Sequence, residues 1–241
     1  MTGGLPSVPL ARVLGRVDAI WHPDRAPHHV VYGMTGSGKS TLIKALLGLC
    51  TAERVAIFDP KPHPDPIWDG SPGDPWRWGR PVTGLAPVFG SGREGGGPAG
   101  LWFRLVGTPD RKDTGRRFAA ALDLLAAEGH CVLALDDVRE ICRQLGLAQK
   151  IDSVMNLGRS ASLLAILSAT EKGYVTGRSQ GSQIWIGHTS GLDAAKAGAE
   201  LLGHSGRAWQ ETTAAVEPHQ FIYSESQPGH AGPCLVTAPP G

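Results

Sequence analysis

The segment Gly33–Ser40 (GMTGSGKS) places the strongest constraint on the fold of this chain of 241 residues. It fits the pattern GxxxxGK followed by Ser or Thr, in which a tight glycine-rich loop turns its backbone N–H groups toward phosphate oxygens. The apolar stretch His29–Tyr32 predicts a strand before the loop, and a helix is expected from about Lys39 to Leu49. These flanking elements disfavour a chance glycine-rich turn. The sequence therefore predicts a phosphate-binding loop at the positive end of a helix dipole.

The residues of this loop have distinct expected roles toward a nucleoside triphosphate. Lys39 is expected to reach the β and γ phosphates, and the hydroxyl of Ser40 is expected to bind Mg²⁺. The predicted cofactors are therefore ATP and Mg²⁺. The residues expected to hold the nucleotide are Gly33, Thr35, Gly36, Ser37, Gly38, Lys39, Ser40 and Thr41.

Two consecutive acidic residues follow a second apolar segment. The run Cys131–Leu135 predicts a strand that is buried on both faces, and Asp136 and Asp137 come directly after it. Asp136 is expected to be the carboxylate that helps to hold Mg²⁺. Asp137 is expected to orient or deprotonate the water that attacks the γ-phosphate. An alternative is that Asp137 only caps the next helix, and Glu140 is a candidate to share its role.

Strands and helices alternate along most of the chain, which predicts an α/β fold with a mostly parallel sheet flanked by helices. The expected helices are Leu10–Ile20, Arg116–Ala127, Leu147–Ala161 and Leu192–Leu202. The other expected strands are Arg54–Phe58, Leu163–Ser168 and Gln183–Ile186, with Phe221–Tyr223 and Leu235–Val236 as a final hairpin.

Residues 60–100 have a different composition from the rest of the chain. They contain nine prolines and ten glycines, which exclude a long helix or a central strand. Three tryptophans, at positions 68, 76 and 78, favour an ordered insertion or lid with a glycine-rich tip at 90–100. A solvated linker remains the alternative.

Charge and hydropathy narrow the function classes. Lys plus Arg number 23 and Asp plus Glu 22, so no general basic field favours nucleic acid, and any such binding must use local loops. No apolar run approaches the roughly 20 residues of a membrane helix. The N-terminus lacks a signal-peptide core, and the four cysteines lack metal-ligand spacing, so we expect a cytoplasmic protein.

Several segments resemble, in family order, the motifs of the FtsK/HerA superfamily of ring-shaped DNA-pumping ATPases, and those of the FtsK/SpoIIIE branch most closely. They span about residues 27–205 and comprise Pro27–Ser40, Ala56–Lys61, Asp136-Asp137, Leu157–Thr170 and Gly198–Gly203. The resemblance implies a RecA-like ATPase domain over residues 27–241 with an insertion of about 60–110. An irregular lead-in over residues 1–26 is expected before it.

The resemblance also implies double-stranded DNA as a partner and a homo-oligomeric ring, most simply a hexamer. A polar, glycine-rich loop after residue 171 carries Lys172 and Arg178, which we expect to contact the DNA backbone; an ordinary exposed loop is the alternative. Arg159 corresponds to an arginine near a subunit boundary, where it can reach the neighbour's γ-phosphate. A surface role for Arg159 stays open, and four other arginines compete for the finger role, namely Arg139, Arg143, Arg178 and Arg207.

Two positions depart from the family pattern. Glu171 stands where the family has a glutamine that senses the γ-phosphate, and a carboxylate there repels a triphosphate unless a cation intervenes. The catalytic glutamate is replaced by Asp137, which is one methylene shorter and is expected to slow turnover. The predicted catalytic residues are Lys39, Asp137, Arg159 and Glu171.

The resemblance as a whole implies an ATP-driven translocase of duplex DNA, in DNA transfer or in a mobile element. A genome-packaging ATPase of the same superfamily, recruited by a phage portal or another protein, is the nearest alternative. The departures at Glu171 and Asp137 favour a different class, a nucleotide-gated switch that pumps nothing.

Overall fold

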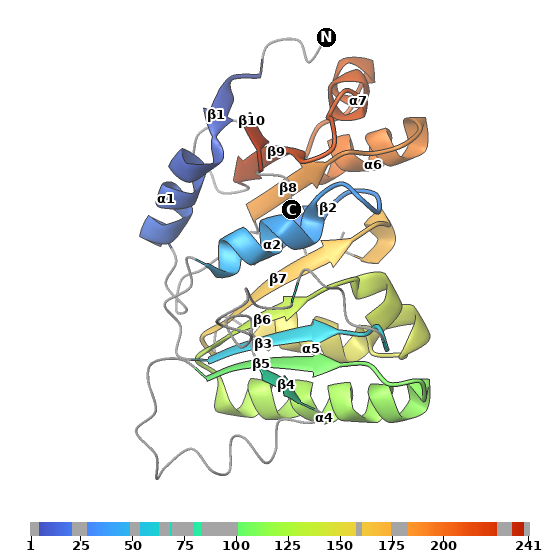
Figure 1. Ribbon diagram of the computed structural model, residues 1–241. Coiled ribbons are helices and arrows are strands. Elements are labelled where there is room, and N and C mark those ends of the chain that lie inside the picture. The colour runs from blue at the N-terminus through green and yellow to red at the C-terminus, as the bar shows by residue number, and fades with distance from the viewer. Residues whose placement is uncertain are drawn as a thin grey trace. The chain divides into compact units, whose positions relative to one another are not determined.

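The computed structural model describes residues 5–20, 28–48, 54–62, 68, 80–82, 101–157, 161–174, 183–225 and 233–238 (Figure 1). These residues form two compact units. Unit 1 takes those that fall within 1–21, 27–50 and 166–241, and unit 2 takes those within 51–165. No helix in the described ranges is both long enough and apolar enough to cross a lipid bilayer.

Unit 1 is built on a mixed sheet with the strand order β1-β10-β9-β8-β2-β7. Its central strand β2 pairs in parallel with β7 and β8, whereas β9 runs antiparallel to both β8 and β10. The predicted final hairpin is thus confirmed. The strand bounds are β1 Ser7–Pro9, β2 His29–Tyr32, β7 Leu163–Ala169 (of which 166–169 belong to unit 1), β8 Gln183–Gly187, β9 Gln220–Glu225 and β10 Cys234–Thr237.

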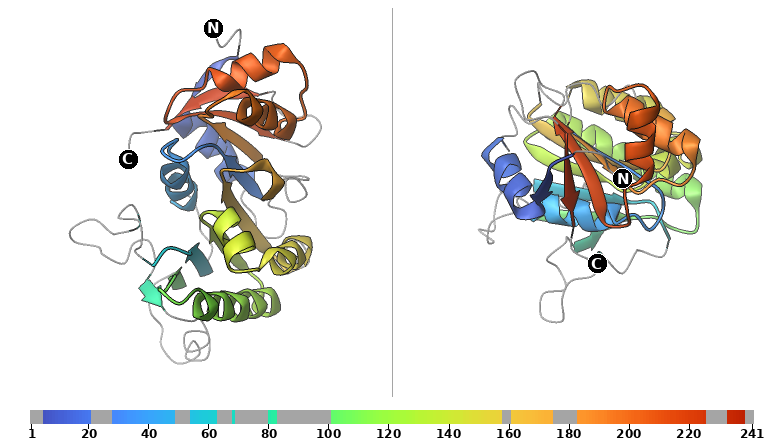
Figure 2. Two further views of the ribbon diagram at one scale, coloured as in Figure 1. Left: turned by 90° about the vertical axis from the view of Figure 1, so that its right-hand side faces the viewer. Right: turned by 90° about the horizontal axis from the view of Figure 1, so that it is seen from above.

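Helices cover both faces of this sheet, with α2 and α6 on opposite sides (Figure 2). A β-carbon built on Gly198 of α6 would lie 2.9 Å from Cγ2 of Ile186, so glycine lets α6 pack closely on β8. The hydroxyl of Thr213 in α7 donates to the carbonyl of Ala195 at 2.7 Å and joins α7 to α6. The helices of unit 1 are α1 Leu10–Ile20, α2 Lys39–Leu47, α6 Leu192–Leu201 and α7 Arg207–Ala214, with a short 3₁₀ turn, η3, at Lys172–Tyr174.

A buried polar pair lies in the middle of this sheet. His29 of β2 is 1% exposed, and its Nδ1 accepts a hydrogen bond from Nε1 of Trp185 at 3.2 Å. Burial first, and the nearby charge of His28 second, lower the pKa of His29 to about 3. The ring is therefore a neutral acceptor in the folded protein.

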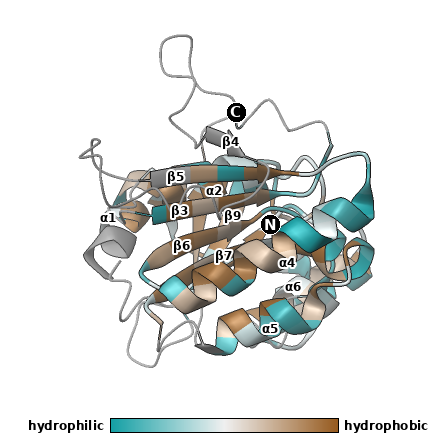
Figure 3. Ribbon diagram, turned by 90° about the horizontal axis from the view of Figure 1, so that it is seen from below, coloured by the Kyte–Doolittle hydropathy of each residue, from teal (hydrophilic) through white to brown (hydrophobic). Residues whose placement is uncertain are grey.

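Unit 2 contains an all-parallel sheet with the order β6-β3-β5-β4. The rings of Phe58 on β3 and Phe118 on α4 meet edge to face at 4.9 Å, which fixes α4 on the sheet. Figure 3 shows the apolar strands beside α4 and α5, with polar residues at the helix ends. The bounds are β3 Arg54–Asp59, β4 Arg80–Val82, β5 Leu101–Val106, α4 Arg111–Glu128, β6 Cys131–Leu135, the π-helix η2 Glu140–Gln144 and α5 Ala148–Leu157.

The expected mostly parallel sheet with flanking helices is confirmed. Helix α5 is described as far as Leu157, residues 158–160 lie outside the described residues, and Ala161, the predicted end of the helix, lies in a turn. Within the insertion, Trp68 is buried and β4 pairs with β5, while positions 76, 78 and 90–100 lie outside the described residues. Strand β1 in the lead-in pairs with β10, which the sequence did not predict. The domain boundaries themselves stay a prediction.

Candidate functional site

The loop Gly33–Ser40 connects β2 to α2 in unit 1, as the sequence predicts (Figure 1). Gly36 and Gly38 have φ angles of +81° and +89°, a backbone conformation that residues with side chains rarely adopt. Gly38 is also the N-cap of α2 and supplies no capping side chain. The first N–H groups of α2 thus keep the arrangement that binds anions in other proteins.

Backbone hydrogen bonds tie the start of this loop to two neighbouring strands. The N–H of Gly33 donates to the carbonyl of Ala169, at the end of β7, over 3.2 Å. The N–H of Met34 donates to the carbonyl of His188, directly after β8, over 2.9 Å. The loop is therefore fixed to the carboxyl edge of the sheet, where nucleotide sites of open α/β folds lie.

Several predicted ligands occupy suitable positions on the loop. The Nζ of Lys39 donates to the carbonyl of Met34 at 2.7 Å, which holds the ammonium over the loop's own backbone. Thr35 is exposed at the tip, and Ser40 and Thr41 are half-buried in the first turn of α2. Ser37 differs, because its side chain is fully buried and its Oγ would lie 2.8 Å from a β-carbon on Gly33. Ser37 can offer a phosphate its backbone only.

Two histidines that the sequence analysis did not select also contact the loop. His188 supplies the carbonyl that holds Met34, and its Nδ1 lies 2.6 Å from the carbonyl of Val216. A carbonyl only accepts, so Nδ1 carries the proton in this contact. The N–H of His219 donates to the carbonyl of Ser37 at 3.2 Å. No local motif marks either residue, because each reaches the loop from a distant part of the chain.

The charge of Glu171 acts on the hydroxyl of Tyr32. Burial first, and the Glu171 carboxylate second, raise the pKa of Tyr32, the residue immediately before Gly33. The Glu171 side chain itself is exposed. The Tyr32 hydroxyl donates to the carbonyl of Ala194 in α6 at 3.4 Å, so this effect places Glu171 on the α6 side, and the expected repulsion of a triphosphate stays a prediction.

Lys172, a predicted DNA contact, forms an ion pair with Glu200 of α6. The hydrogen bond from Lys172 is the main cause that lowers the pKa of Glu200. About 29% of the Lys172 side chain is exposed, so part of its surface still faces solvent. Its partner in the prediction, Arg178, and the predicted arginine finger, Arg159, lie outside the described residues.

In unit 2, two buried carboxylates lie at the ends of neighbouring strands. Phe58 on β3 pairs with Leu135 on β6, and the next residues are Asp59 and Asp136. The N–H of Asp136 donates to the carbonyl of Phe58 at 3.1 Å, and Asp136 is only 4% exposed. Asp136 is among the site residues predicted from the sequence and Asp59 is not, although Asp59 directly follows the predicted strand Arg54–Phe58 just as Asp136 follows Cys131–Leu135. Adjacent carboxylates of this kind suit a magnesium ion that keeps most of its waters.

The side chain of Asp137 accepts a hydrogen bond of the helix-capping kind, although its backbone is left-handed. Its φ is +56°, and its Oδ1 accepts a hydrogen bond from the N–H of Glu140 at 3.3 Å. Asp137 thus makes a capping hydrogen bond, and its expected role toward water stays a prediction. Glu140 pairs with Arg111 of α4 at 3.5 Å, so its carboxylate is already occupied. In the described ranges, no three His, Cys, Asp or Glu side chains cluster as a metal cage.

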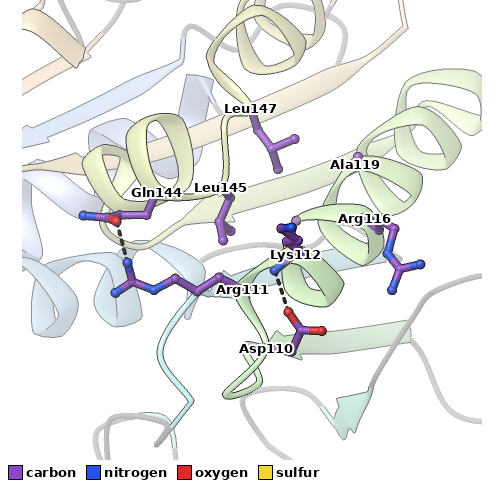
Figure 4. A pocket seen from close by; sticks show the side chains of 9 residues that line it. Asp110, Arg111, Lys112, Arg116, Ala119, Gln144, Leu145 and Leu147 are labelled. Carbon is purple, nitrogen blue, oxygen red and sulfur yellow. Dashed lines mark hydrogen bonds between the residues drawn. The ribbon is translucent and has the colours of Figure 1, made fainter.

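A separate groove of about 780 Å³ lies beside the first turns of α4 in unit 2 (Figure 4). The guanidinium of Arg111 donates there to Oε1 of Gln144 at 2.5 Å, and the carboxylate of Asp110 caps α4. No predicted site residue lines this groove. Its lining consists of Asp110, Arg111, Lys112, Gly115, Arg116, Ala119, Gln144, Leu145 and Leu147.

Comparison with solved structures finds ATPases. The genome-packaging NTPase B204 of Sulfolobus turreted icosahedral virus 2, bound to AMPPCP, matches with a TM-score of 0.54 and 18% identity over 83% of this chain and 92% of its own. The DNA-packaging ATPase B204 of Sulfolobus turreted icosahedral virus gives 0.53 and 17% over 85% and 93%. The cytoplasmic domain of the type VII secretion ATPase EccC of Thermomonospora curvata gives 0.55 and 16%, over 88% of this chain and 25% of its own.

No protein-family model matches the sequence, and no curated protein matches it. At these identities the structural likeness concerns the fold. The predicted RecA-like fold, a mostly parallel sheet flanked by helices, is confirmed, and the resemblance to the FtsK/HerA superfamily and to its FtsK/SpoIIIE branch stays a prediction.

Proposed function

We propose that the chain is an ATPase whose phosphate loop, Gly33–Ser40, binds the triphosphate of ATP. The observation that carries this proposal is the loop itself, with two left-handed glycines, an uncapped helix start and anchors on two strands. Lys39 would contact the β and γ phosphates, and Ser40 and Asp136 would hold Mg²⁺. The bound ATP and Mg²⁺ supply the phosphoryl group and neutralise its developing charge.

Three further side chains complete the proposed site. Asp137 orients the attacking water while it also caps the helix that follows. Arg159 reaches the γ-phosphate from a neighbouring subunit, where its planar, permanently charged guanidinium suits a transition state rich in negative charge. Glu171, in place of a neutral sensor, makes the site depend on a cation near the γ-phosphate.

Beyond ATP hydrolysis itself, we propose that hydrolysis drives the movement of double-stranded DNA through a ring of identical subunits. The motifs of the FtsK/HerA superfamily support it, as do two packaging ATPases that share the fold over more than four fifths of this chain. Packaging of a genome, with a portal or another protein that recruits the ring, is the setting that these neighbours favour. Lys172 and Arg178 would contact the DNA backbone without reading bases.

A nucleotide switch that pumps nothing is the second candidate. Glu171, which stands where the family has a neutral glutamine, favours it, because a carboxylate near the γ-phosphate would repel bound ATP. DNA-stimulated hydrolysis separates the two functions, since only a motor requires it.

The test is phosphate release from ATP with and without duplex DNA, for the wild type, Lys39→Ala and Lys44→Ala. Lys39→Ala should lose hydrolysis by about 10²-fold or more and keep the wild-type melting temperature, because Lys39 stabilises transferring charge rather than the core. Lys44 lies on the same helix and is half-buried like Lys39, so it serves as the matched control and should keep its activity.

Unchanged turnover in Lys39→Ala would overturn the ATPase proposal. A different result would contradict only the motor. If ATP hydrolysis is normal but does not change with duplex DNA, and the protein stays monomeric with ATP, the ATPase proposal stands and the motor proposal is wrong.

A further inference from the structure

A tight turn directly before β9 brings His219 against the phosphate loop. The N–H of His219 donates to the carbonyl of Ser37 at 3.2 Å, and its own carbonyl accepts from the N–H of Ala238 at 2.7 Å. His219 thereby joins the loop to the end of the β9–β10 hairpin. Its φ is +62°, a left-handed conformation that carries a cost for a residue with a side chain.

The imidazole of His219 lies directly against Gly38. A β-carbon built on Gly38 would be 2.9 Å from Nδ1 and 3.4 Å from both Cγ and Cε1 of this ring. Gly38 therefore needs to be glycine for two independent reasons, its left-handed backbone and the ring beside it. In the described part of the chain, Nδ1 of His219 is buried without a hydrogen-bond partner, as is Oγ of Ser37.

The hydrogen bond to Ser37 determines which way one peptide unit faces. In a trans peptide the carbonyl and the next N–H point in opposite directions. Because the Ser37 carbonyl points toward His219, the N–H of Gly38 points away from His219. The ring meanwhile prevents Gly38 from moving back toward the hairpin, so this N–H is held on the face of the loop opposite His219.

We propose that His219 is a positioning residue of the phosphate loop, which sets the Ser37–Gly38 peptide for phosphate binding through one backbone bond and the packing of its ring. This inference rests on the proposed nucleotide site and assigns a part of it to a segment some 180 residues away in sequence. A left-handed histidine with a buried, unpartnered nitrogen is a strained arrangement, and such strain persists where the surrounding structure imposes it.

The chain offers a matched control in His130. This residue also has a left-handed backbone, with φ +47°, lies directly before a strand and donates its N–H to a carbonyl, that of Ala161 at 2.9 Å. It belongs to unit 2, whereas the phosphate loop belongs to unit 1. His130→Gly and His219→Gly each remove one imidazole and relieve one left-handed side chain, so they have similar general effects on the backbone.

The first test uses hydrogen exchange without nucleotide. His219→Gly should speed exchange in the peptide that covers residues 33–42 by about 10-fold or more, whereas His130→Gly should leave it unchanged. His219→Asn should recover part of the protection, because asparagine tolerates the left-handed backbone and fills part of the space. Wild-type exchange in both His219 variants would overturn the proposal.

The second test is the affinity for a fluorescent ADP analogue, together with KM and kcat. His219→Gly should raise Kd and KM by about 10-fold and leave kcat less affected, with His219→Asn in between. If the wild type binds the analogue and both His219 variants bind it equally well, the proposal is wrong and the nucleotide site stands. If the wild type itself binds no nucleotide, the proposed function fails first, and the assignment of His219 fails with it.

Discussion

Substitution of Asp137 separates its observed capping role from its proposed catalytic one. The side chain accepts from the N–H of Glu140, and the backbone is left-handed at φ +56°. Asparagine has the same shape, tolerates the same backbone and keeps an oxygen for the capping bond. Asp137→Asn therefore removes the carboxylate charge and little else. Asp137→Ala removes the cap as well and places alanine in a conformation that it disfavours.

The structure gives the expected size of each effect. Asp137→Ala should cost about 1 kcal/mol for the lost cap and about 1–2 kcal/mol for the left-handed backbone. A chain of this size loses about 2–4 °C of melting temperature per kcal/mol, so Asp137→Ala should melt about 4–12 °C lower. Asp137→Asn should change stability by less than about 0.5 kcal/mol. Both variants should lose hydrolysis by about 10²-fold or more while they still bind ATP.

The assay combines phosphate release, nucleotide binding and thermal melting on the same preparations. Asp137→Glu restores the residue typical of the family and should preserve or raise turnover, at a melting temperature close to that of Asp137→Ala, because glutamate is a poor cap. Normal hydrolysis by Asp137→Asn would show that Asp137 only caps the helix and that another acid positions the water. Equal melting of the Asn and Ala variants would refute the capping geometry.

Two further outcomes are expected. Burial first and His28 second lower the pKa of His29 to about 3, so the folded state binds fewer protons than the unfolded state below pH 6.5, and stability falls as pH falls toward 3. At pH 5 the free energy of unfolding should be lower by about 2 kcal/mol than at neutral pH. In His29→Gln the midpoint of urea unfolding should therefore change less between pH 7.5 and pH 5 than in the wild type. The double variant Lys172→Ala, Arg178→Ala should show less stimulation of ATP hydrolysis by DNA, with basal hydrolysis unchanged. Glu200→Gln removes the ion pair of Lys172 and should therefore raise the affinity for DNA at low salt.

Local patterns sufficed to predict the larger elements of the fold. The run Cys131–Leu135 is apolar throughout and forms β6 at the expected residues, and α1 also has its expected bounds. For three of the described elements that the sequence did not predict, the physical reason is clear. Helix α7, Arg207–Ala214, is mostly polar, β1 has three residues that include a proline, and β5 directly follows a glycine-rich stretch that hides its start.

Some residues of the candidate site could also be predicted from local sequence patterns, and others could not. The phosphate loop was predictable because its glycines, Lys39 and Ser40 act within one short segment. Asp59 could have been found from the sequence, since it ends an apolar strand just as Asp136 does. His188 and His219 could not, because their contacts depend on which strands become neighbours, and their own surroundings in the sequence carry no motif.

The antiparallel strand β9 explains how a distant histidine reaches a loop at the carboxyl edge of parallel strands. Strands β2, β7 and β8 run in parallel, so their carboxyl ends meet at one edge, where Ala169 and His188 hold the loop. A further parallel strand would start at the opposite edge. Because β9 runs antiparallel to β8, with Phe221 opposite Gly187, it starts at the edge where β8 ends. The residue before β9 therefore lies at the phosphate loop, and the reversal of this strand gives the loop a third attachment, which comes from the start of a strand and not from its end.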